Sequence, residues 1–408
     1  MLYRTVPKTN DSLSILGFGC MRLPEKSGFI DEERSTQLIR TAIESGVNYL
    51  DTAWLYHRGQ SEVFLGKALQ DGYRKKVRLA TKLPHWLVKN RQDMDSFLNI
   101  QLNRLQTDHI DYYLIHSLTR ESWHRMKELG VTGFLDAAKR DGRIVNAGFS
   151  FHDDTTSFKE VINEYDWGFC QIQYNILDEH HQAGVEGLKY AAEKNLAVII
   201  MEPLLGGKLA QNIPKEVQAV WDEAEVKRKP AEWALLWLWN HPEITVVLSG
   251  MNDETHLFEN LRTASYAYPG SLTKADMTCI RKAVVIYQSL KKIPCTGCGY
   301  CMPCPYGVDI PTCFDIYNTR HMFRDQRYVW FLYAKRVGGV LGTITRASLC
   351  RNCNTCARVC PQNIHIPGKL QDVAHEFEGV GFRLLVALAQ IFLPVIRHIE
   401  LVRNRRLK

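Results

Sequence analysis

Short apolar and β-branched runs alternate with helical patterns over the first 275 residues of the chain. Each run has the length of a buried strand, and apolar residues in the intervening stretches recur every three or four positions, as on one face of a helix. Eight such units in about 250 residues predict an α/β fold, a (β/α)8 TIM barrel, because an open doubly wound sheet usually has fewer strands. The predicted strands are Ile15–Gly19, Val47–Asp51, Val77–Thr81, Tyr112–His116, Val145–Ser150, Cys170–Gln173, Ala197–Met201 and Thr245–Ser249.

The length of the chain, 408 residues, exceeds what one hydrophobic core usually organises, so we expect at least two domains. We predict the barrel over residues 1–275, a small, mainly helical domain over 276–375, and an amphipathic basic tail over 376–408. The hydrophobic content of 45% and the charged content of 23% are typical of a globular protein in water. Because residues 1–10 lack the pattern of a secretory signal, we expect a cytoplasmic protein.

Two cysteine runs mark the last third of the chain. One is Cys295-x2-Cys298-x2-Cys301-x2-Cys304-Pro305, and the other is Cys350-x2-Cys353-x2-Cys356-x3-Cys360-Pro361. Four closely spaced thiolates followed by proline form the ligand run of bacterial ferredoxins. Structural zinc needs only two C-x2-C pairs per ion, and disulfides suit short secreted domains. The runs therefore predict two [4Fe–4S] clusters in a ferredoxin-like dicluster domain, and with them one-electron transfer.

The assignment of ligands to each cluster follows from the crossover rule of such domains, in which the fourth cysteine of a run binds the other cluster. One predicted set is Cys295, Cys298, Cys301 and Cys360, and the other is Cys350, Cys353, Cys356 and Cys304. The first run closes with x2 where ferredoxins usually have x3, so Cys313 is an alternative to Cys304. The remaining cysteines are scattered, and we interpret them as ordinary thiols: Cys20, Cys170 and Cys279.

The formal net charge of +7 comes mostly from the C-terminal tail, so the body of the protein is near neutral and we expect no nucleic-acid partner. The tail contains Leu384–Ile396, thirteen residues without a charge. A bilayer span needs about 20 apolar residues, so this run is too short to cross a membrane. Contact with a membrane surface is a weak alternative. Since Pro394 interrupts any straight helix, we expect the run to pack on the protein itself.

Polar residues stand where three consecutive predicted strands end. Asp51 ends the second strand, Lys82 follows the third, His116 ends the fourth, and Tyr56 lies in the loop after the second. In a barrel of this class, chemistry occurs at the carboxyl ends of the strands. A buried Lys–Asp pair beside a tyrosine can lower the pKa of the phenol and make it a proton donor, and a histidine can orient the substrate oxygen. Any one of these residues could instead belong to a structural ion pair.

At these residues the chain resembles the aldo/keto reductase superfamily, over about residues 1–268. The carrying motifs are Asp51-Thr52-Ala53-Trp54-Leu55-Tyr56 with Ser61-Glu62, Thr81-Lys82, and Leu114-Ile115-His116. The resemblance implies that Tyr56 is the general acid for a carbonyl oxygen, that Lys82 and Asp51 lower its pKa, and that His116 orients the substrate. The whole chain resembles the branch of the family in which such a barrel is fused to a ferredoxin-like dicluster domain.

The cofactor pocket implied by the resemblance departs from the family pattern in places. The residues that match it are Ser150, Gln171, Ser249, Gly250, Glu259 and Asn260. Phe151 replaces the asparagine that helps to hold the nicotinamide amide, and Met201 replaces the stacking tyrosine. No lysine or arginine lies between Ser249 and Asn260 to receive a 2′-phosphate, so we expect NAD(H) rather than NADP(H).

The leading interpretation is an oxidoreductase that interconverts a small carbonyl and an alcohol, coupled to two clusters that exchange electrons with a ferredoxin-like carrier. The alternative is an electron-transfer or assembly protein in which the barrel is chiefly a scaffold. Nucleotide binding separates the two. We also expect aromatic residues in the loops after the second and third strands to line the mouth of the barrel: Trp54, His57, His85 and Trp86.

Overall fold

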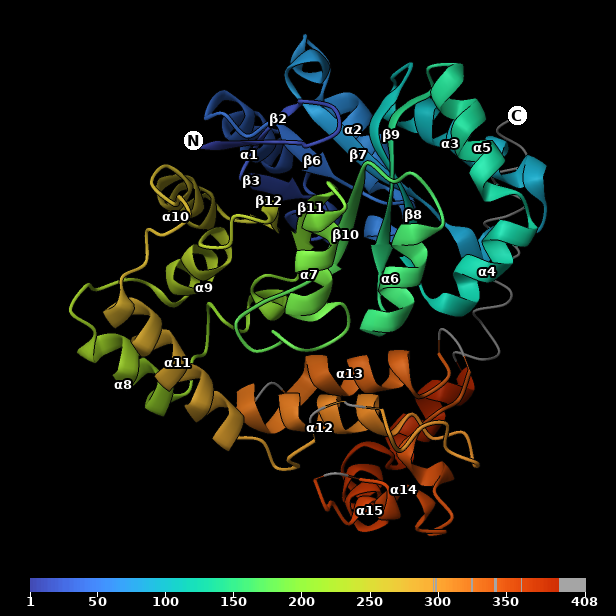
Figure 1. Cartoon of the computed structure of the whole chain (residues 1–408), viewed down its shortest axis with the longest axis vertical. Helices are drawn as coiled ribbons and strands as arrows, with labels where there is room; N and C mark the ends of the chain where they lie inside the picture. The colour runs from blue at the N-terminus through green and yellow to red at the C-terminus, as the bar shows by residue number, and fades with distance from the viewer. Residues whose placement is uncertain (296, 298, 324–325, 341–342, 361, 389–408) are drawn as a thin grey trace. The chain divides into compact units, whose positions relative to one another are not determined.

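The computed structural model describes the chain except for residues 296, 298, 324–325, 341–342, 361 and 389–408 (Figure 1). It divides into two compact units, one comprising Met1–Ile213 with Gln218–Lys282, and the other Pro214–Val217 with Ala283–Lys408. Within the part of the chain that is described, no helix has both the length and the apolar character that a membrane span requires.

The first unit contains a closed barrel of eight parallel strands, which confirms the predicted fold (Figure 1, blue to yellow). The apolar runs form these strands because both of their faces are covered, by helices outside and side chains inside. In barrel order the strands are β3 (Leu16–Gly19), β6 (Tyr49–Asp51), β7 (Arg78–Leu83), β8 (Ile110–Leu118), β9 (Ile144–Phe151), β10 (Phe169–Gln173), β11 (Ala197–Met201) and β12 (Ile244–Ser249), and β12 pairs with β3.

Helices follow the barrel strands, and side-chain caps define where several of them begin. The Asp31 carboxylate accepts the backbone N–H of Arg34, and Asn90 and Asp93 form a capping box. The helices of the barrel unit are α1 (Glu32–Glu44), α2 (Ser61–Ala68), α3 (Arg91–Leu105), α4 (Arg120–Glu128), α5 (Val131–Arg140), α6 (Thr155–Asn163), α7 (Gly184–Glu193), α9 (Pro230–Trp239) and α10 (Glu254–Ala264). Helices α8 (Lys215–Glu223) and α11 (Lys274–Ser289) each contain residues of both units.

An N-terminal hairpin of β1 (Tyr3–Thr5) and β2 (Ser12–Ser14), which the sequence pattern did not predict, packs on the barrel interior. Its Val6 and Leu13 belong to the same buried cluster as Tyr49, Tyr112 and Phe169 from the barrel strands. These strand residues precede the carboxyl ends that carry the predicted catalytic groups, so the hairpin covers the opposite end of the barrel. A second small hairpin, β4 (Glu25–Lys26) with β5 (Phe29–Ile30), lies in the loop after β3.

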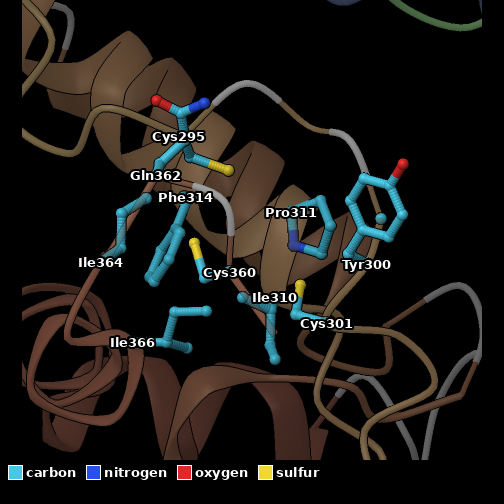
Figure 2. Close-up of a pocket in the computed structure, with 11 residues that line it drawn as sticks. Cys295, Tyr300, Cys301, Ile310, Pro311, Phe314, Cys360, Gln362, Ile364 and Ile366 are labelled. Atoms are coloured by element: carbon cyan, nitrogen blue, oxygen red, sulfur yellow. The ribbon is translucent and has the colours of Figure 1, made fainter. Parts of the chain in front are cut away.

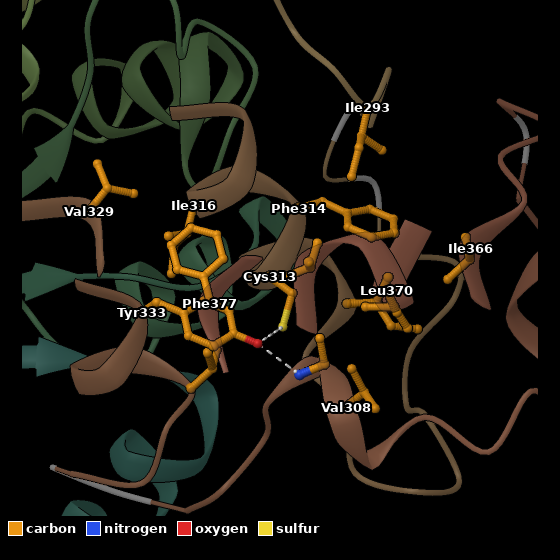
Figure 3. Packing of buried hydrophobic residues seen from close by; sticks show 14 of the residues in the cluster. Ile293, Val308, Cys313, Phe314, Ile316, Val329, Tyr333, Ile366, Leu370 and Phe377 are labelled. Atoms are coloured by element: carbon orange, nitrogen blue, oxygen red, sulfur yellow. Dashed lines mark hydrogen bonds between the residues drawn. The ribbon is translucent and has the colours of Figure 1, made fainter. Parts of the chain in front are cut away.

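The second unit is mainly helical and has its own core (Figure 3). Its helices are α12 (Ile310–Phe323), α13 (Gln326–Arg336), α14 (Thr355–Arg358) and α15 (Ile366–Phe377), and residues 380–388 are also helical. The Tyr333 and Phe377 rings stack at 4.5 Å between centroids, and Phe382 and Val386 are buried in the same core. Of the run Leu384–Ile396 only residues 384–388 are described; Val386 is buried in this core, whereas Leu384 and Leu388 are exposed, so the expected packing of the run stays a prediction.

Candidate functional site

The four predicted catalytic residues converge at the carboxyl end of the barrel. Lys82 Nζ lies 2.6 Å from Asp51 Oδ1, 2.8 Å from the Thr52 carbonyl oxygen and 3.4 Å from the Tyr56 hydroxyl. The Tyr56 and His116 rings are 6.3 Å apart between centroids and nearly perpendicular. The structure thus brings the tetrad together around the Tyr56 hydroxyl.

The electrostatics of Tyr56 differ from the expectation. Burial is the largest influence and raises the pKa of the Tyr56 phenol above its ordinary value, while the Lys82 ammonium acts in the opposite direction and Asp51 adds to the rise. The expected lowering of the pKa is therefore wrong, because burial outweighs the charge of Lys82. Burial also disfavours the Lys82 ammonium, but Asp51 and Tyr56 together more than offset this and raise the pKa of Lys82. The cation that would stabilise a phenolate is therefore present at neutral pH.

His116 is held in its neutral form. Burial, followed by the charge of Lys82, lowers the pKa of His116 well below its ordinary value. Its Nδ1 is buried and has no hydrogen-bond partner in the described part of the chain. A neutral imidazole can donate one hydrogen bond and accept another, which suits a group that orients a carbonyl oxygen.

Ser61 and Glu62, the Ser–Glu part of the sequence signature, take part in hydrogen bonds that hold the strands carrying Asp51 and Lys82. The Thr52 hydroxyl donates to Ser61 Oγ at 2.9 Å. Buried Glu62 accepts from the Thr81 hydroxyl at 2.7 Å and from Gln101 at 2.6 Å, and Gln101 also donates to the Lys82 carbonyl at 3.0 Å. These bonds fix the backbone on which Asp51 and Lys82 stand. Ser61 and Glu62 are therefore positioning residues.

Two of the four aromatic residues expected at the mouth of the barrel face elsewhere. Trp54 is only 7% exposed; its ring packs on Phe97 and lies 3.8 Å beneath the Arg104 guanidinium. Trp86 is 39% exposed and its ring lies 5.2 Å from that of His116, so it does border the site. The His85 ring is 5.3 Å from Trp86, and burial lowers the pKa of His85 to about 4.

His57 does not line the mouth of the barrel. Its hydrogen bonds instead hold the loop that contains Tyr56. Its side chain is 6% exposed, Nε2 accepts the Leu23 backbone N–H at 3.0 Å, and Nδ1 lies 2.9 Å from Glu25 Oε1. His57 and Arg58 both have left-handed backbone conformations, with φ of 49° and 58°. Each such non-glycine residue costs about 1–2 kcal/mol, so the bonds of His57 help to hold a strained turn directly after Tyr56.

Replacing His57 with alanine is expected to lower kcat by about tenfold to a hundredfold, because a displacement of 1 Å at a reacting group can cost that much. Nucleotide affinity should change little, since His57 acts on the Tyr56 loop. Arg58→Ala is the matched control: it alters the neighbouring left-handed residue, whose side chain is exposed. Steady-state kinetics and nucleotide titration would measure both, and equal kinetics in the two variants would contradict the role of His57.

The predicted cofactor residues surround the adjoining strand ends. Ser150 Oγ accepts the Ser117 backbone N–H at 2.7 Å, and Asn260 donates to Ser249 Oγ at 3.0 Å. Gln171 Oε1 is buried without a hydrogen-bond partner among the described residues, and Gln171 Nε2 lies 3.7 Å from the Met201 sulfur. Glu259 forms an ion pair with Lys229. An orphaned buried amide oxygen fits an amide N–H₂ donor such as that of nicotinamide.

Two arginines near the cofactor residues were not predicted from the sequence. Arg22 lies close to the loops after β11 and β12. If Gly206 carried a Cβ atom, that atom would lie 3.0 Å from the Arg22 guanidinium, and a Cβ atom on Gly250 would lie 3.4 Å from Arg22 Cβ. Arg22 has no paired carboxylate in the described part of the chain. Arg22 could have been predicted from its position two residues after Cys20, because it follows the carboxyl end of the first strand, where the site of such a barrel lies. Arg34 of α1 pairs with Asp253 at 3.1 Å and with Glu254, and nothing in the sequence indicated this contact.

The two cysteine runs meet in the second unit. Cys295 and Cys301 of the first run and Cys360 of the second line one pocket, together with Tyr300 and Phe314 (Figure 2). This is the first predicted ligand set without Cys298, which lies outside the described residues. Cys304 and Cys350 are both close enough to Cys356 to influence its charge. Three cysteines of the second predicted set, Cys304, Cys350 and Cys356, are thereby near one another.

Cys313, the alternative ligand, belongs to the hydrophobic core of the second unit, against which Cys304 and Cys350 also pack. It is fully buried, its Sγ stands 4.0 Å from the Tyr333 hydroxyl and 3.8 Å from the Thr345 carbonyl oxygen, and burial raises the pKa of its thiol (Figure 3). Such a neutral thiol is a poor ligand, so the structure favours Cys304.

The donor set fits iron–sulfur clusters in its chemistry, and all of the described cysteines are free thiols. Thr355 and nearby backbone groups lower the pKa of Cys353, which favours the thiolate. Among the residues that are described, no three His, Cys, Asp or Glu side chains already form an ion site. Buried polar groups anchor the approach to each run: Asn318 bonds both backbone groups of Ile293, and Glu378 accepts the Ser348 N–H at 3.0 Å.

Comparison with known proteins agrees with both units. Residues 15–283 match the aldo/keto reductase family, and residues 294–365 match the 4Fe-4S dicluster domain. The chain is 30% identical over 230 residues to Aldo-keto reductase YhdN of Bacillus subtilis, covering 53% of this chain and 66% of that one. It is 24% identical over 324 residues to the NADH-specific methylglyoxal reductase of Escherichia coli, covering 67% and 95%.

Among solved structures, the holo form of aldo-keto reductase AKR11C1 from Bacillus halodurans superposes with a TM-score of 0.58 at 26% identity. The superposition covers 69% of this chain and 96% of that protein, so the C-terminal unit is an addition to the shared barrel. The chain belongs to the aldo/keto reductase family and carries a 4Fe-4S dicluster domain after its barrel.

Proposed function

We propose that the barrel interconverts a small carbonyl compound and its alcohol with NAD(H). The observation that carries the proposal is the contact of the Lys82 ammonium with both Asp51 and the Tyr56 hydroxyl, beside the neutral ring of His116. This arrangement supports the roles of Tyr56 as proton donor, of Lys82 as the cation that stabilises its anion, and of His116 as the imidazole that orients the substrate. Such a group of residues is suited to proton transfer to a carbonyl oxygen.

In the reducing direction, a bound nicotinamide would supply the hydride. Tyr56 donates its phenolic proton to the carbonyl oxygen, and Lys82 stabilises the phenolate that remains. His116, being neutral, donates a hydrogen bond to the same oxygen and fixes the orientation of the substrate. Trp86 borders this space and favours a flat or apolar substituent on the substrate.

The nucleotide would be held by residues of the last four strand ends. Gln171 Oε1 is free to accept from the carboxamide, and Arg22 lies beside the glycine-containing loops after β11 and β12. Loops after the seventh and eighth strands of such barrels frequently bind phosphate, which an unpaired guanidinium suits.

Related reductases are named for either nucleotide, so membership of the family does not decide between NADH and NADPH. In this chain we expect the preference to depend on the residues at the start of α10. Arg34 is the nearby cation, but Asp253 and Glu254 already bind it. We therefore expect NADH to bind at least about tenfold more tightly than NADPH. The double variant Asp253→Asn, Glu254→Gln should free Arg34 to bind the 2′-phosphate of NADPH. The preference for NADH should therefore become smaller.

Titration of both nucleotides, followed by tryptophan fluorescence, would measure this preference in the unmodified protein and in the double variant. Replacing Arg34 with alanine in the double variant is the control, and it should restore the preference for NADH. Equal affinities in the unmodified protein would contradict the expectation.

The cysteines of the dicluster domain would hold two [4Fe–4S] clusters, which supply one-electron transfer when bound. We propose that a small ferredoxin-like carrier exchanges electrons with this domain. No residue pattern in the sequence resembles a flavin site that would split the electron pair of a hydride into single electrons.

The test of the proposed function is anaerobic NADH oxidation with small aldehydes and ketones as substrates, together with spectroscopy of the clusters. Carbonyl-dependent oxidation of NADH would support the proposal. Failure of the loaded protein to bind either nucleotide would overturn it and leave the barrel as a scaffold for an electron-transfer protein.

A further inference from the structure

Both cysteine runs lie in segments without acidic residues. No aspartate or glutamate occurs between Lys291 and Val308, or between Arg346 and Gln371. The pocket lined by Cys295, Cys301 and Cys360 brings the two segments side by side (Figure 2). The two segments therefore lie next to one another at this pocket, to which Tyr300 and Cys301 contribute from the first and Cys360 and Gln362 from the second.

We call the surface of these two segments the cluster face and define it by its exposed side chains: Tyr300, Met302, Tyr306, Arg351, Arg358 and Val359. Tyr300 is 70% exposed, Val359 51% and Tyr306 47%. Each of these three residues is within two positions of a cysteine of the runs. Large apolar and aromatic groups that remain this exposed beside a functional site are characteristic of interaction surfaces.

The arginines of the cluster face are not neutralised. Arg351 and Arg358 have no carboxylate partner in the described part of the chain, and Lys292 is likewise exposed and unpaired. The neighbouring cations differ: Arg346 pairs with Glu378, and Lys369 pairs with Asp372. The positive charge that remains is therefore concentrated next to the cysteines.

We propose that the cluster face docks a small acidic one-electron carrier protein. Tyr300, Tyr306 and Val359 provide the apolar centre, while Arg351 and Arg358 form a basic rim that attracts and orients an acidic partner. Each encounter transfers one electron: a reduced carrier is oxidised by one electron, and one cysteine-bound cluster is reduced by one. This inference rests on the electron-carrier part of the proposed function and assigns its surface and the sign of its charge.

A nucleic acid or an anionic membrane would also be attracted to exposed arginines. A protein carrier is favoured because the unpaired cations are few, whereas nucleic-acid sites usually make many phosphate contacts. The exposed aromatic residues lie beside the cysteines, so a protein docked on them would be separated from a bound cluster by only a short distance for electron transfer.

The experiment uses the anaerobically purified, iron-loaded full chain and an acidic [2Fe–2S] ferredoxin as the probe. Binding by calorimetry should weaken steeply as salt is added, because the attraction is between exposed charges. The double variant Arg351→Glu, Arg358→Glu should bind at least about tenfold more weakly and should slow reduction by the ferredoxin. Reduction by dithionite, a small molecule that needs no docking surface, should be unchanged.

The matched control is Lys75→Glu, Arg140→Glu, which makes the same change in net charge at exposed positions near the amino ends of the barrel strands. It should bind the ferredoxin like the unmodified chain. Because Arg351 adjoins Cys350, iron content is measured in each variant. Tyr300→Ser, which changes no charge, provides a second variant and should also weaken binding.

Equal loss in the control, or unchanged binding in both the arginine variant and Tyr300→Ser, would overturn the docking proposal. So would arginine-dependent binding of DNA or anionic vesicles without binding of ferredoxin. Carbonyl-dependent NADH oxidation is measured on the same proteins: its absence would overturn the reductase proposal while ferredoxin binding still tests the cluster face.

Discussion

Replacing Tyr56 with phenylalanine is expected to lower kcat for carbonyl reduction by about 100- to 10,000-fold, the range typical of losing a general acid. The Tyr56 hydroxyl lies 3.4 Å from Lys82 Nζ, so the charge that develops on it during proton transfer is stabilised only in the transition state. The affinity for NADH should therefore stay nearly unchanged. Steady-state kinetics and nucleotide titration would measure the two effects separately.

The pH dependence of the unmodified protein provides a second check on Tyr56. A general acid must carry its proton, so its contribution is present below its pKa and is lost as the pH rises through that value. Because burial raises the pKa of Tyr56 above 10.0, kcat/KM for reduction should not fall through loss of this proton between pH 7 and pH 9.

Tyr49→Phe is the matched control for Tyr56→Phe. Tyr49 stands on the strand that ends at Asp51, and its buried hydroxyl has no hydrogen-bond partner among the described residues. Removing that hydroxyl should leave kcat within about twofold of the original. If Tyr56→Phe retained full turnover, the proton donor would have to be another group, and the mechanism proposed for the barrel would be wrong.

The sequence was sufficient to predict the barrel because its eight strands are mostly buried on both faces and therefore rich in apolar residues, and such runs are visible without knowledge of their partners. The same pattern could not reveal the hairpin of β1 and β2. Its strands have three residues each, and its buried Val6 and Leu13 gain their apolar environment only from Tyr49, Tyr112 and Phe169.

Contacts between distant residues explain the other differences at the site. Arg34 meets Glu254, 220 residues further along the chain, so a search for cations near Asp253 could not find it. Trp54 was expected at the mouth because it lies in a strand-end loop, but its ring instead covers the ion pair of Arg104 with Glu62. The direction of the Tyr56 pKa shift depends on depth of burial, which spacing in a sequence does not indicate.

The cysteine assignment predicts an equally large effect in the second unit. The intact protein should contain about eight irons and eight sulfides per chain. Cys304→Ser should lose about half of the iron, because Cys304 lies with Cys350 around Cys356 and would complete that cluster. Cys313→Ala should retain all of it, because the Cys313 thiol contacts Tyr333 and Thr345 and burial raises its pKa, which disfavours the thiolate that a cluster needs.

Anaerobic iron and sulfide analysis with electron paramagnetic resonance would distinguish these outcomes. Cys313→Ala removes a buried sulfur and can destabilise the core, so iron is measured on folded protein after size-exclusion chromatography. Loss of iron from folded Cys313→Ala with retention in Cys304→Ser would reverse the assignment. Stoichiometric zinc without a cluster signal would instead show that the eight cysteines form metal sites of another kind. Only the pattern in which Cys304 is required and Cys313 is dispensable agrees with the crossed arrangement, in which each run completes the cluster of the other.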